Sequence, residues 1–335
     1  MVPLQPADAF MNRIEFQNLL EQGVRDGVFP GYCAAVGDRG GVLLSAHGGN
    51  RALYPAALPM EEDVLFDMAS LSKLMGTTMA FLCLYEQGRI APEQTLGEFF
   101  PNCYGKEKIT LHQLLTHTSG IKAHFPLWLR GISPEQAADH ILREPLGIPT
   151  GSDVVYSCMG FILLGKIIEQ VMGEPLDVIV RREVFLPLGM ETACYNPPRT
   201  AVCAATEGET CGTVHDENAA FLGGVSANAG VFASLADCVK FATMLSRGGE
   251  GFLKPETFRK AVYNYTPGMD ENRGLGFQLC SFGMGHTGFT GTSLYVNEQG
   301  RYAVLLTNRV HPTRANGKLP AFRREFHKKI LQEEV

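Results

Sequence analysis

The stretch from Met68 to Tyr85 constrains the fold most strongly, because nearly every residue after Ser70 is apolar or small. The run is too short, and too often interrupted by glycine and threonine, for a comfortable membrane span. It ends at Glu86-Gln87-Gly88, which is typical of a helix C-terminus. Because a helix that is apolar on all sides lies in a protein interior, we predict a buried central helix that begins near Ser70.

The first turn of this helix carries two polar side chains, Ser70 and Lys73, at a spacing that puts them on one face. Burying an ammonium group is costly unless it is paired or neutralised. A desolvated lysine has a lowered pKa and can accept a proton from a neighbouring hydroxyl. The positive end of the helix also favours an oxyanion that forms at Ser70. This pattern predicts that Ser70 is a nucleophile and that Lys73 is part of its base.

Composition excludes several classes of function. The 335 residues are 45% hydrophobic and 19% charged, with a net charge of −6 and no basic run, so nucleic acid is not an expected partner. The sequence nowhere reaches the roughly 18 consecutive apolar residues of a transmembrane helix. The first six residues lack the basic and apolar regions of a signal peptide, and the nine cysteines are scattered without a C-x-x-C pair. We therefore expect a cytoplasmic protein without disulfides.

Strand-like segments occur near both ends of the chain, and helical patterns occupy the middle. The expected strands are 32–37, 42–47, 276–282, 291–297 and 302–308. Asp8 is expected to cap a first helix that continues to about Asp26, and a basic amphipathic helix is expected at 322–331. The pattern predicts an α/β (α+β) fold in which one antiparallel sheet, built from both termini and flanked by helices, receives a mostly helical insertion.

We expect the whole chain, 1–335, to be a single catalytic unit. Residues 8–68 and 230–333 would form the α/β subdomain, and residues 69–229 the mostly helical one. The active site would lie between the two subdomains.

Two further stretches strengthen the interpretation of Ser70-Leu71-Ser72-Lys73. They are Val155-Tyr156-Ser157-Cys158-Met159-Gly160 and His286-Thr287-Gly288-Phe289-Thr290-Gly291. In order and approximate spacing, the three stretches resemble the motifs of serine β-lactamases and penicillin-binding proteins, most closely those of the class C β-lactamase group. That group also includes DD-peptidases, D-aminopeptidases, esterases and acyltransferases. The resemblance implies a β-lactamase/transpeptidase-like fold and no cofactor.

The resemblance also assigns roles to individual residues. Ser70 would be acylated, and Lys73 and Tyr156 would share the base, with Tyr156 protonating the leaving group. The division of this work between Lys73 and Tyr156 stays open. The backbone N–H groups of Ser70 and Phe289 would form the oxyanion hole.

Two of the positions that would contact substrate depart from the family pattern. Asn usually stands where this chain has Cys158, and Lys often stands at His286, which is followed by Thr287 and Gly288. A thiol is a weak donor and acceptor, and a histidine is about half charged near pH 6.5. We therefore expect poor hydrolysis of anionic β-lactams, and carboxylate binding that improves as the pH falls toward 6.

The predicted function is that of a serine hydrolase that forms an acyl-enzyme at Ser70 on a small ester or amide, as a carboxylesterase or a D-amino-acid peptidase. The alternatives are a β-lactamase proper and a non-catalytic penicillin-binding sensor or scaffold. The run His215-Asp216-Glu217 lacks a second histidine at ligand spacing, so no metal site is expected. The partner is a small ester, amide or peptide, and the sequence leaves the oligomeric state open.

Overall fold

An eight-stranded antiparallel sheet combines strands from the two ends of the chain. The computed structural model describes residues 11–313 and 317–332. In this part of the chain the strand order is β3-β2-β1-β11-β10-β9-β8-β7. The strands are β1 (Gly31–Asp38), β2 (Gly41–Ala52), β3 (Leu58–Pro59), β7 (Asn272–Arg273), β8 (Gln278–Cys280), β9 (Gly283–Thr287), β10 (Ser293–Val296) and β11 (Tyr302–Thr307). The pairing of β1 with β11 confirms the expected sheet from both termini.

Both faces of the central strands are buried. In β1, Tyr32 and Val36 pack into one hydrophobic cluster, whereas Cys33 and Ala35 pack into another on the opposite side. Successive side chains of a strand point to opposite faces, so a strand covered on both sides has to be apolar throughout. The sequence of β1 meets this requirement.

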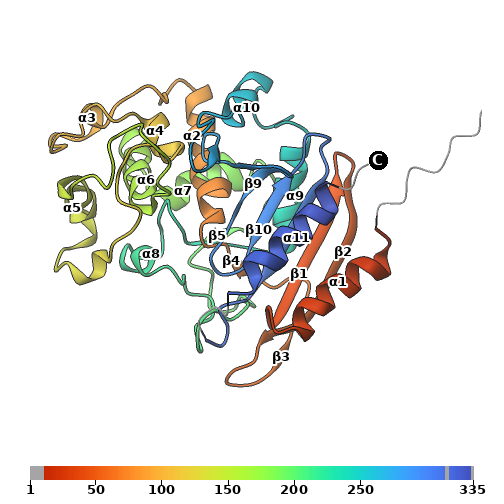
Figure 1. Ribbon diagram of the computed structural model, residues 1–335. Helices are drawn as coiled ribbons and strands as arrows, with labels where there is room; N and C mark the ends of the chain where they lie inside the picture. Colours follow the sequence, from red (N-terminus) through yellow and green to blue (C-terminus); the bar gives the residue numbers. More distant parts are fainter. Residues whose placement is uncertain (1–10, 314–316, 333–335) are drawn as a thin grey trace, which may run out of the picture.

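Helices from the two ends of the chain cover one face of the sheet. They are α1 (Arg13–Arg25) and α11 (Leu319–Leu331), which lie next to the strands in Figure 1. Phe16 and Phe326 join them, with ring centroids 6.2 Å apart. The helix α9 (Leu235–Ser246) packs against β1 and β11 through Phe241 in the other cluster. Asn12 caps α1 through a capping box, and the expected cap Asp8 lies outside the described residues.

The remaining helices gather beside the sheet (Figure 1). They are α2 (Met79–Glu86), α3 (Leu96–Phe99), α4 (Leu111–Leu115), α5 (Ala137–Arg143), α6 (Cys158–Met172), α7 (Leu176–Val180), α8 (Glu217–Phe221) and α10 (Pro255–Ala261). A small second sheet, in the order β4-β6-β5, consists of β4 (Phe66–Asp67), β5 (Cys194–Tyr195) and β6 (Val231–Ala233). Single turns occur at Lys73–Thr78 and Arg181–Phe185, which are π-helical, and at Leu127–Leu129 and Pro134–Gln136, which are 3₁₀.

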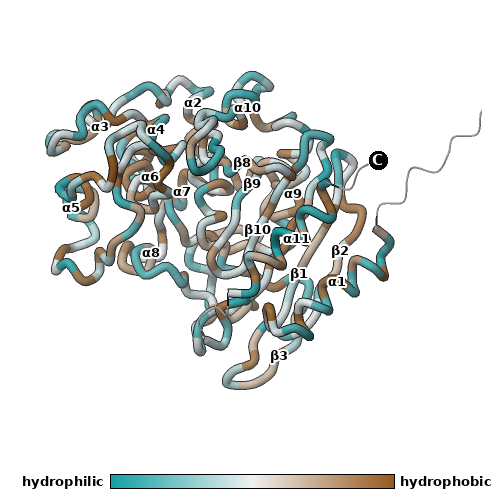
Figure 2. Tube along the Cα trace, in the orientation of Figure 1, coloured by the Kyte–Doolittle hydropathy of each residue, from teal (hydrophilic) through white to brown (hydrophobic). Residues whose placement is uncertain are grey.

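One hydrophobic cluster runs from the helices into the sheet, and Figure 2 shows the apolar, brown segments of α6 within the helical part. The division into subdomains at residues 69 and 229 stays a prediction. Its outer limits, residues 8 and 333, fall outside the described part of the chain.

The strands β9 and β7 of the large sheet were not expected from the sequence. β9 contains Gly283 and Gly285, which weaken the strand pattern, and β7 is only two residues long. Both form because β10 and β8 offer them backbone partners. Among the described residues, none of the helices has the length and apolarity needed to cross a bilayer.

Candidate active site

Ser70 stands at the junction between a strand of the small sheet and the central helix. Ala69 and Asp67, which precede Ser70, fix the turn. Ala69 has φ of +46°, and its N–H donates to Asp67 Oδ1 at 2.8 Å. The second oxygen of Asp67 accepts from the His215 N–H at 2.7 Å. Burial raises the pKa of this carboxyl to about 6, against the lowering effect of the two backbone donors. Asp67 thereby ties the nucleophile's turn to the loop before α8.

Lys73 is buried and is held by groups from three parts of the chain. The central helix takes a π-helical turn at Lys73–Thr78, a feature that often marks functional sites. The Lys73 Nζ donates to Ser70 Oγ at 3.1 Å and to the Asn228 carbonyl at 2.8 Å, and lies 3.4 Å from Cys158 Sγ. The structure therefore gives the ammonium two oxygen acceptors, one of which is the predicted nucleophile.

The pKa of Lys73 differs from the sequence-based expectation. Burial acts to lower this pKa, but the negative charges that Cys158 and Tyr156 can carry act to raise it, and the net direction is upward. The expected lowering is wrong because it considered desolvation without the neighbouring acidic groups. With its pKa raised, Lys73 is charged in the resting site, so the predicted base role would require the Lys73–Tyr156 pair to lose a proton first.

Tyr156 is placed by the residue that follows it. The Ser157 side chain caps α6 by accepting from the Gly160 N–H at 2.9 Å, and the Ser157 N–H donates to His117 Nδ1 at 3.0 Å. The Tyr156 hydroxyl is buried close to Lys73 and Ser70, although among the described residues it has ideal hydrogen-bond geometry with neither. Burial raises the pKa of Tyr156, and the nearby Lys73 ammonium opposes this rise.

The third motif packs directly against the segment that carries Ser70. A Cβ atom on Gly288 would lie 2.1 Å from Thr292 Oγ1 and 2.4 Å from the Met68 carbonyl oxygen, so only glycine fits. Within the described residues, the backbone N–H groups of Ser70 and Phe289 donate to no protein acceptor. Free donors are what an oxyanion hole requires.

His286 is a buried, neutral side chain that lies against Tyr156, with ring centroids 5.8 Å apart. Its Nδ1 bonds the Thr287 carbonyl at 2.8 Å, and its Nε2 has no partner among the described groups. Burial, with the charges of Arg273 and Lys73, lowers the pKa of His286 well below its usual value. The expected gain of a proton near pH 6 is therefore wrong, because the sequence did not show these two cations beside the imidazole.

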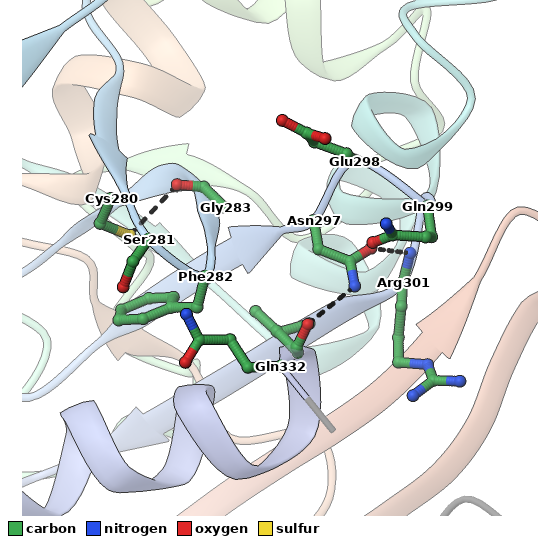
Figure 3. A pocket seen from close by; sticks show the side chains of 10 residues that line it. Cys280, Ser281, Phe282, Gly283, Asn297, Glu298, Gln299, Arg301 and Gln332 are labelled. Carbon is green, nitrogen blue, oxygen red and sulfur yellow. Dashed lines mark hydrogen bonds between the residues drawn. The ribbon is translucent and has the colours of Figure 1, made fainter. Parts of the chain in front are cut away.

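A cavity of about 380 Å³ opens in front of Ser70. Its lining residues are Ala69, Ser70, Ala123, His124, Tyr156, Cys158, His215, Asp216, Glu217, Ala229 and Phe289. A larger hollow of about 730 Å³ lies away from Ser70, between two strand turns and the end of α11, and its lining includes Cys280, Asn297 and Gln332 (Figure 3). Nothing in that hollow resembles catalytic machinery, so the cavity at Ser70 is the candidate active site.

Some of the predicted site residues line the cavity and others lie close to it without lining it. Ser70, Tyr156, Cys158 and Phe289 line the cavity, with Lys73 buried behind Ser70. His286, Thr287 and Gly288 follow one another at the end of β9 and do not line it.

Sequence reasoning missed three residues: Asn228, which binds Lys73 through its carbonyl, His117, which positions Ser157, and Arg273, which lies over the Tyr156 ring. The run Leu114-Leu115-Thr116-His117-Thr118-Ser119-Gly120 is a further stretch that resembles the family pattern, and it carried a signal for His117. Asn228 acts through a backbone carbonyl, which any residue possesses, so its type carried no signal.

A serine bonded to a buried lysine at a cavity, beside a buried tyrosine and two free backbone donors, is an arrangement that can support acyl transfer. The sequence model of the beta-lactamase family matches residues 16–328, and the chain belongs to this family of serine hydrolases.

Relatives of known sequence agree with this assignment. An Escherichia coli (strain K12) protein that carries the provisional name D-alanyl-D-alanine carboxypeptidase is 28% identical over 320 residues, covering 77% of this chain and 73% of its own. An N-acetylmuramyl-L-alanine amidase of Bacillus subtilis (strain 168) is 27% identical, covering 88% of this chain and 80% of its own.

Solved structures share the fold. The D-amino acid amidase of Ochrobactrum anthropi SV3 has a TM-score of 0.76 at 20% identity, covering 95% of this chain and 97% of that one. EstCE1, a hydrolase with promiscuous acyltransferase activity, has a TM-score of 0.75 at 20% identity and covers 94% of this chain and 97% of that one.

Proposed function

We propose that the protein hydrolyses small esters or amides that carry no carboxylate beside the scissile bond, through an acyl-enzyme at Ser70. The observation that carries this proposal is the 3.1 Å contact between Lys73 Nζ and Ser70 Oγ at the floor of the cavity. A lysine at 0% exposure, bonded to a serine that faces a cavity, has few uses other than proton transfer.

In the proposed reaction, Ser70 Oγ attacks the carbonyl carbon and its proton passes to the deprotonated Lys73–Tyr156 pair. The carbonyl oxygen becomes an oxyanion, which the N–H groups of Ser70 and Phe289 receive. The pair then returns the proton to the leaving oxygen or nitrogen as that bond breaks. Water repeats the sequence on the acyl-enzyme and releases the acid.

The charges around the cavity favour a neutral or cationic substrate. Asp216 and Glu217 line it, and none of the described residues in its lining is a lysine or an arginine. His286, at the position of the family's lysine, is neutral because burial and adjacent cations lower its pKa. A substrate carboxylate would therefore meet two like charges on the lining, while the Lys73 ammonium is buried behind Ser70 and bonded to its hydroxyl.

The relatives support ester and amide chemistry. The named activities of the two solved structures are an amidase and a hydrolase with acyltransferase activity, and both are acyl-transfer reactions. Nine free cysteines, with no disulfide, support a cytoplasmic location. The alternative of a non-catalytic sensor has no supporting observation, since a binding protein would need neither the buried lysine nor the free oxyanion donors.

The test is intact-mass analysis and steady-state kinetics on the wild type and on Ser70→Ala. A fluorophosphonate should label the wild type once, and Ser70→Ala should lose both the label and the turnover of a short p-nitrophenyl ester. Ser72→Ala is the matched control: its hydroxyl accepts from the Val231 N–H at 3.1 Å, away from the cavity, and turnover should persist.

Penicillin hydrolysis measures the substrate class in the same assay. We expect kcat/KM for penicillin to lie far below that for the neutral ester. A wild type with penicillin kcat/KM near ~10⁵ M⁻¹s⁻¹ or above, well inside the ordinary enzyme range, would instead make the protein a β-lactamase. A label on a serine other than Ser70 would contradict the proposal altogether.

A further inference from the structure

The third motif lacks the fixed positive charge that lysine supplies in the family pattern. His286 cannot replace that charge, because its Nδ1 is bonded to the Thr287 carbonyl and the side chain is 3% exposed. A site that relies on proton loss from Lys73 and Tyr156 nevertheless needs neighbouring positive charge to lower their pKa values toward neutrality.

Arg273 brings such a charge to the other side of Tyr156. It is the last residue of β7, which pairs with β8 at the sheet edge next to β9. Its backbone is fixed by two bonds, from its N–H to Thr266 Oγ1 at 2.8 Å and from the Tyr265 N–H to its carbonyl at 2.9 Å. Its side chain runs inward, and the guanidinium carbon lies 5.3 Å from the centroid of the Tyr156 ring.

A structural ion pair does not account for this burial. Arg273 Nη2 contacts Glu271, whose side chain is 42% exposed, whereas the Arg273 side chain is only 4% exposed. The Arg273 Nε is buried with no partner among the described residues. An exposed carboxylate returns little of the cost of burying a guanidinium group, so the fold gains little by placing Arg273 there.

The groups that face Tyr156 come from several elements. They are Ser70, Lys73 of the π-helical turn, Cys158 of α6, His117 after α4, His286 of β9 and Arg273 of β7, with the Asp216 carboxylate acting on Lys73. Both histidines are buried with lowered pKa values and are neutral. Within the described part of the chain, Lys73 and Arg273 are the positively charged side chains over the Tyr156 ring, and of these Arg273 does not belong to the pair that transfers the proton.

We propose that Arg273 is a positioning residue that supplies, from β7, the fixed cation missing from the third motif. It does not touch substrate, because it does not line the cavity. Its charge favours the deprotonated form of the Lys73–Tyr156 pair, whichever of the two loses the proton, so the pair can accept the Ser70 proton nearer to neutral pH. This inference rests on the proposed function, since it concerns the same proton transfer.

The test is the pH profile of kcat/KM for a neutral ester. Activity should rise with pH as the pair loses its proton. Removing the cation in Arg273→Met or Arg273→Gln should move this acidic limb upward by about one pH unit, which is about a tenfold loss below the limb and little loss above it. Arg273→Lys should hold the limb near the wild-type position.

Two further variants separate charge from structure. Glu271→Gln removes the ion pair but keeps the cation, so its limb should stay within a few tenths of a pH unit of the wild type. His286→Lys in the Arg273→Met background should move the limb back toward neutrality. His286→Lys alone should move the acidic limb to lower pH than in the wild type. If thermal unfolding shows that neither Arg273 variant folds, the pH profile of this variant tests the inference instead.

Several outcomes would overturn the inference. One is an acidic limb of the pH profile that stays at the same pH both when the Arg273 cation is removed and when a lysine is added at His286. Another is an equal loss at every pH in Arg273→Met and Glu271→Gln, which would make Arg273 purely structural. Either result leaves the proposed function intact if Ser70→Ala is inactive, whereas an active Ser70→Ala would overturn the proposed function itself.

Discussion

At the scale of single residues, the charge state of the site depends on the groups that contact Lys73. Lys73 contacts a hydroxyl, a thiol and a backbone carbonyl, and its ammonium lies 4.9 Å from the centroid of the Tyr156 ring. Each acidic neighbour raises the pKa of Lys73, while the lysine charge lowers that of Tyr156. Two groups coupled in this way titrate as one unit, so neither can be assigned the proton alone.

This coupling predicts non-additive losses. Lys73→Ala and Tyr156→Phe should each lower kcat on a neutral ester on the order of a hundredfold or more, because each removes half of the proton acceptor. The double variant should lose much less than the product of the two, as residues that act as a unit do. Steady-state kinetics on the three proteins measures this, and losses that simply multiply would show that the two residues act separately.

At the scale of elements, the site depends on how closely β9 and the turn after it approach the segment before the central helix. Thr292 Oγ1 donates to the Met68 carbonyl at 3.0 Å, and Thr290 Oγ1 donates to the Asp67 carbonyl at 2.6 Å. These bonds join the third motif to the first. They place the free N–H groups of Ser70 and Phe289 on neighbouring segments.

The close approach predicts a strong effect of a single methyl group. Gly288→Ala should lower the melting temperature and cost about 1–3 kcal/mol of stability, because its Cβ would lie 2.1 Å from Thr292 Oγ1. It should also reduce kcat for the neutral ester by displacing Phe289. Gly147→Ala is the matched control, since its Cβ would have 3.7 Å to the nearest atom, the Gly120 carbonyl oxygen. If the two variants behave alike in thermal unfolding and in kinetics, the packing argument fails.

At the scale of the whole molecule, buried histidines tie stability to pH. His117, His286 and His327 are each buried, and burial is the main cause that lowers the pKa of each well below the usual value. In the unfolded chain these side chains take up a proton near pH 6.5. Their contribution to stability is therefore complete above that pH and is lost as the pH falls below it.

We expect the free energy of unfolding to fall between pH 6.5 and pH 5 by up to about 1.4 kcal/mol per pH unit for each of these histidines. His327, whose Nε2 contacts Ser293 Oγ at 2.8 Å, lies far along the chain from the cavity residues. His327→Gln should reduce the slope by about one histidine's share. His47→Gln, at an exposed position in β2, should leave it unchanged. Denaturant unfolding at several pH values measures the slopes, and equal slopes in all three proteins would contradict the prediction.

The sequence alone determined the parts of this protein that depend on local spacing. Ser70 and Lys73 share a helical turn because they are three residues apart, and their contact follows from helix geometry. The strand-like apolar segments near both ends of the chain, together with helical patterns between them, predicted one sheet from both termini. The order of the three motifs predicted the family, which the family model confirms.

Only the tertiary structure decided the charge state of the site. The pKa of Lys73 is raised, and that of His286 is lowered far beyond the expectation, because both depend on groups that are distant in the chain and close in space. The position of Arg273 beside Tyr156 was likewise decided by the tertiary structure, because nothing in the local sequence distinguishes Arg273 from an ordinary loop residue. Electrostatic interactions fall with distance and grow with burial, and neither quantity can be read from the order of residues along the chain.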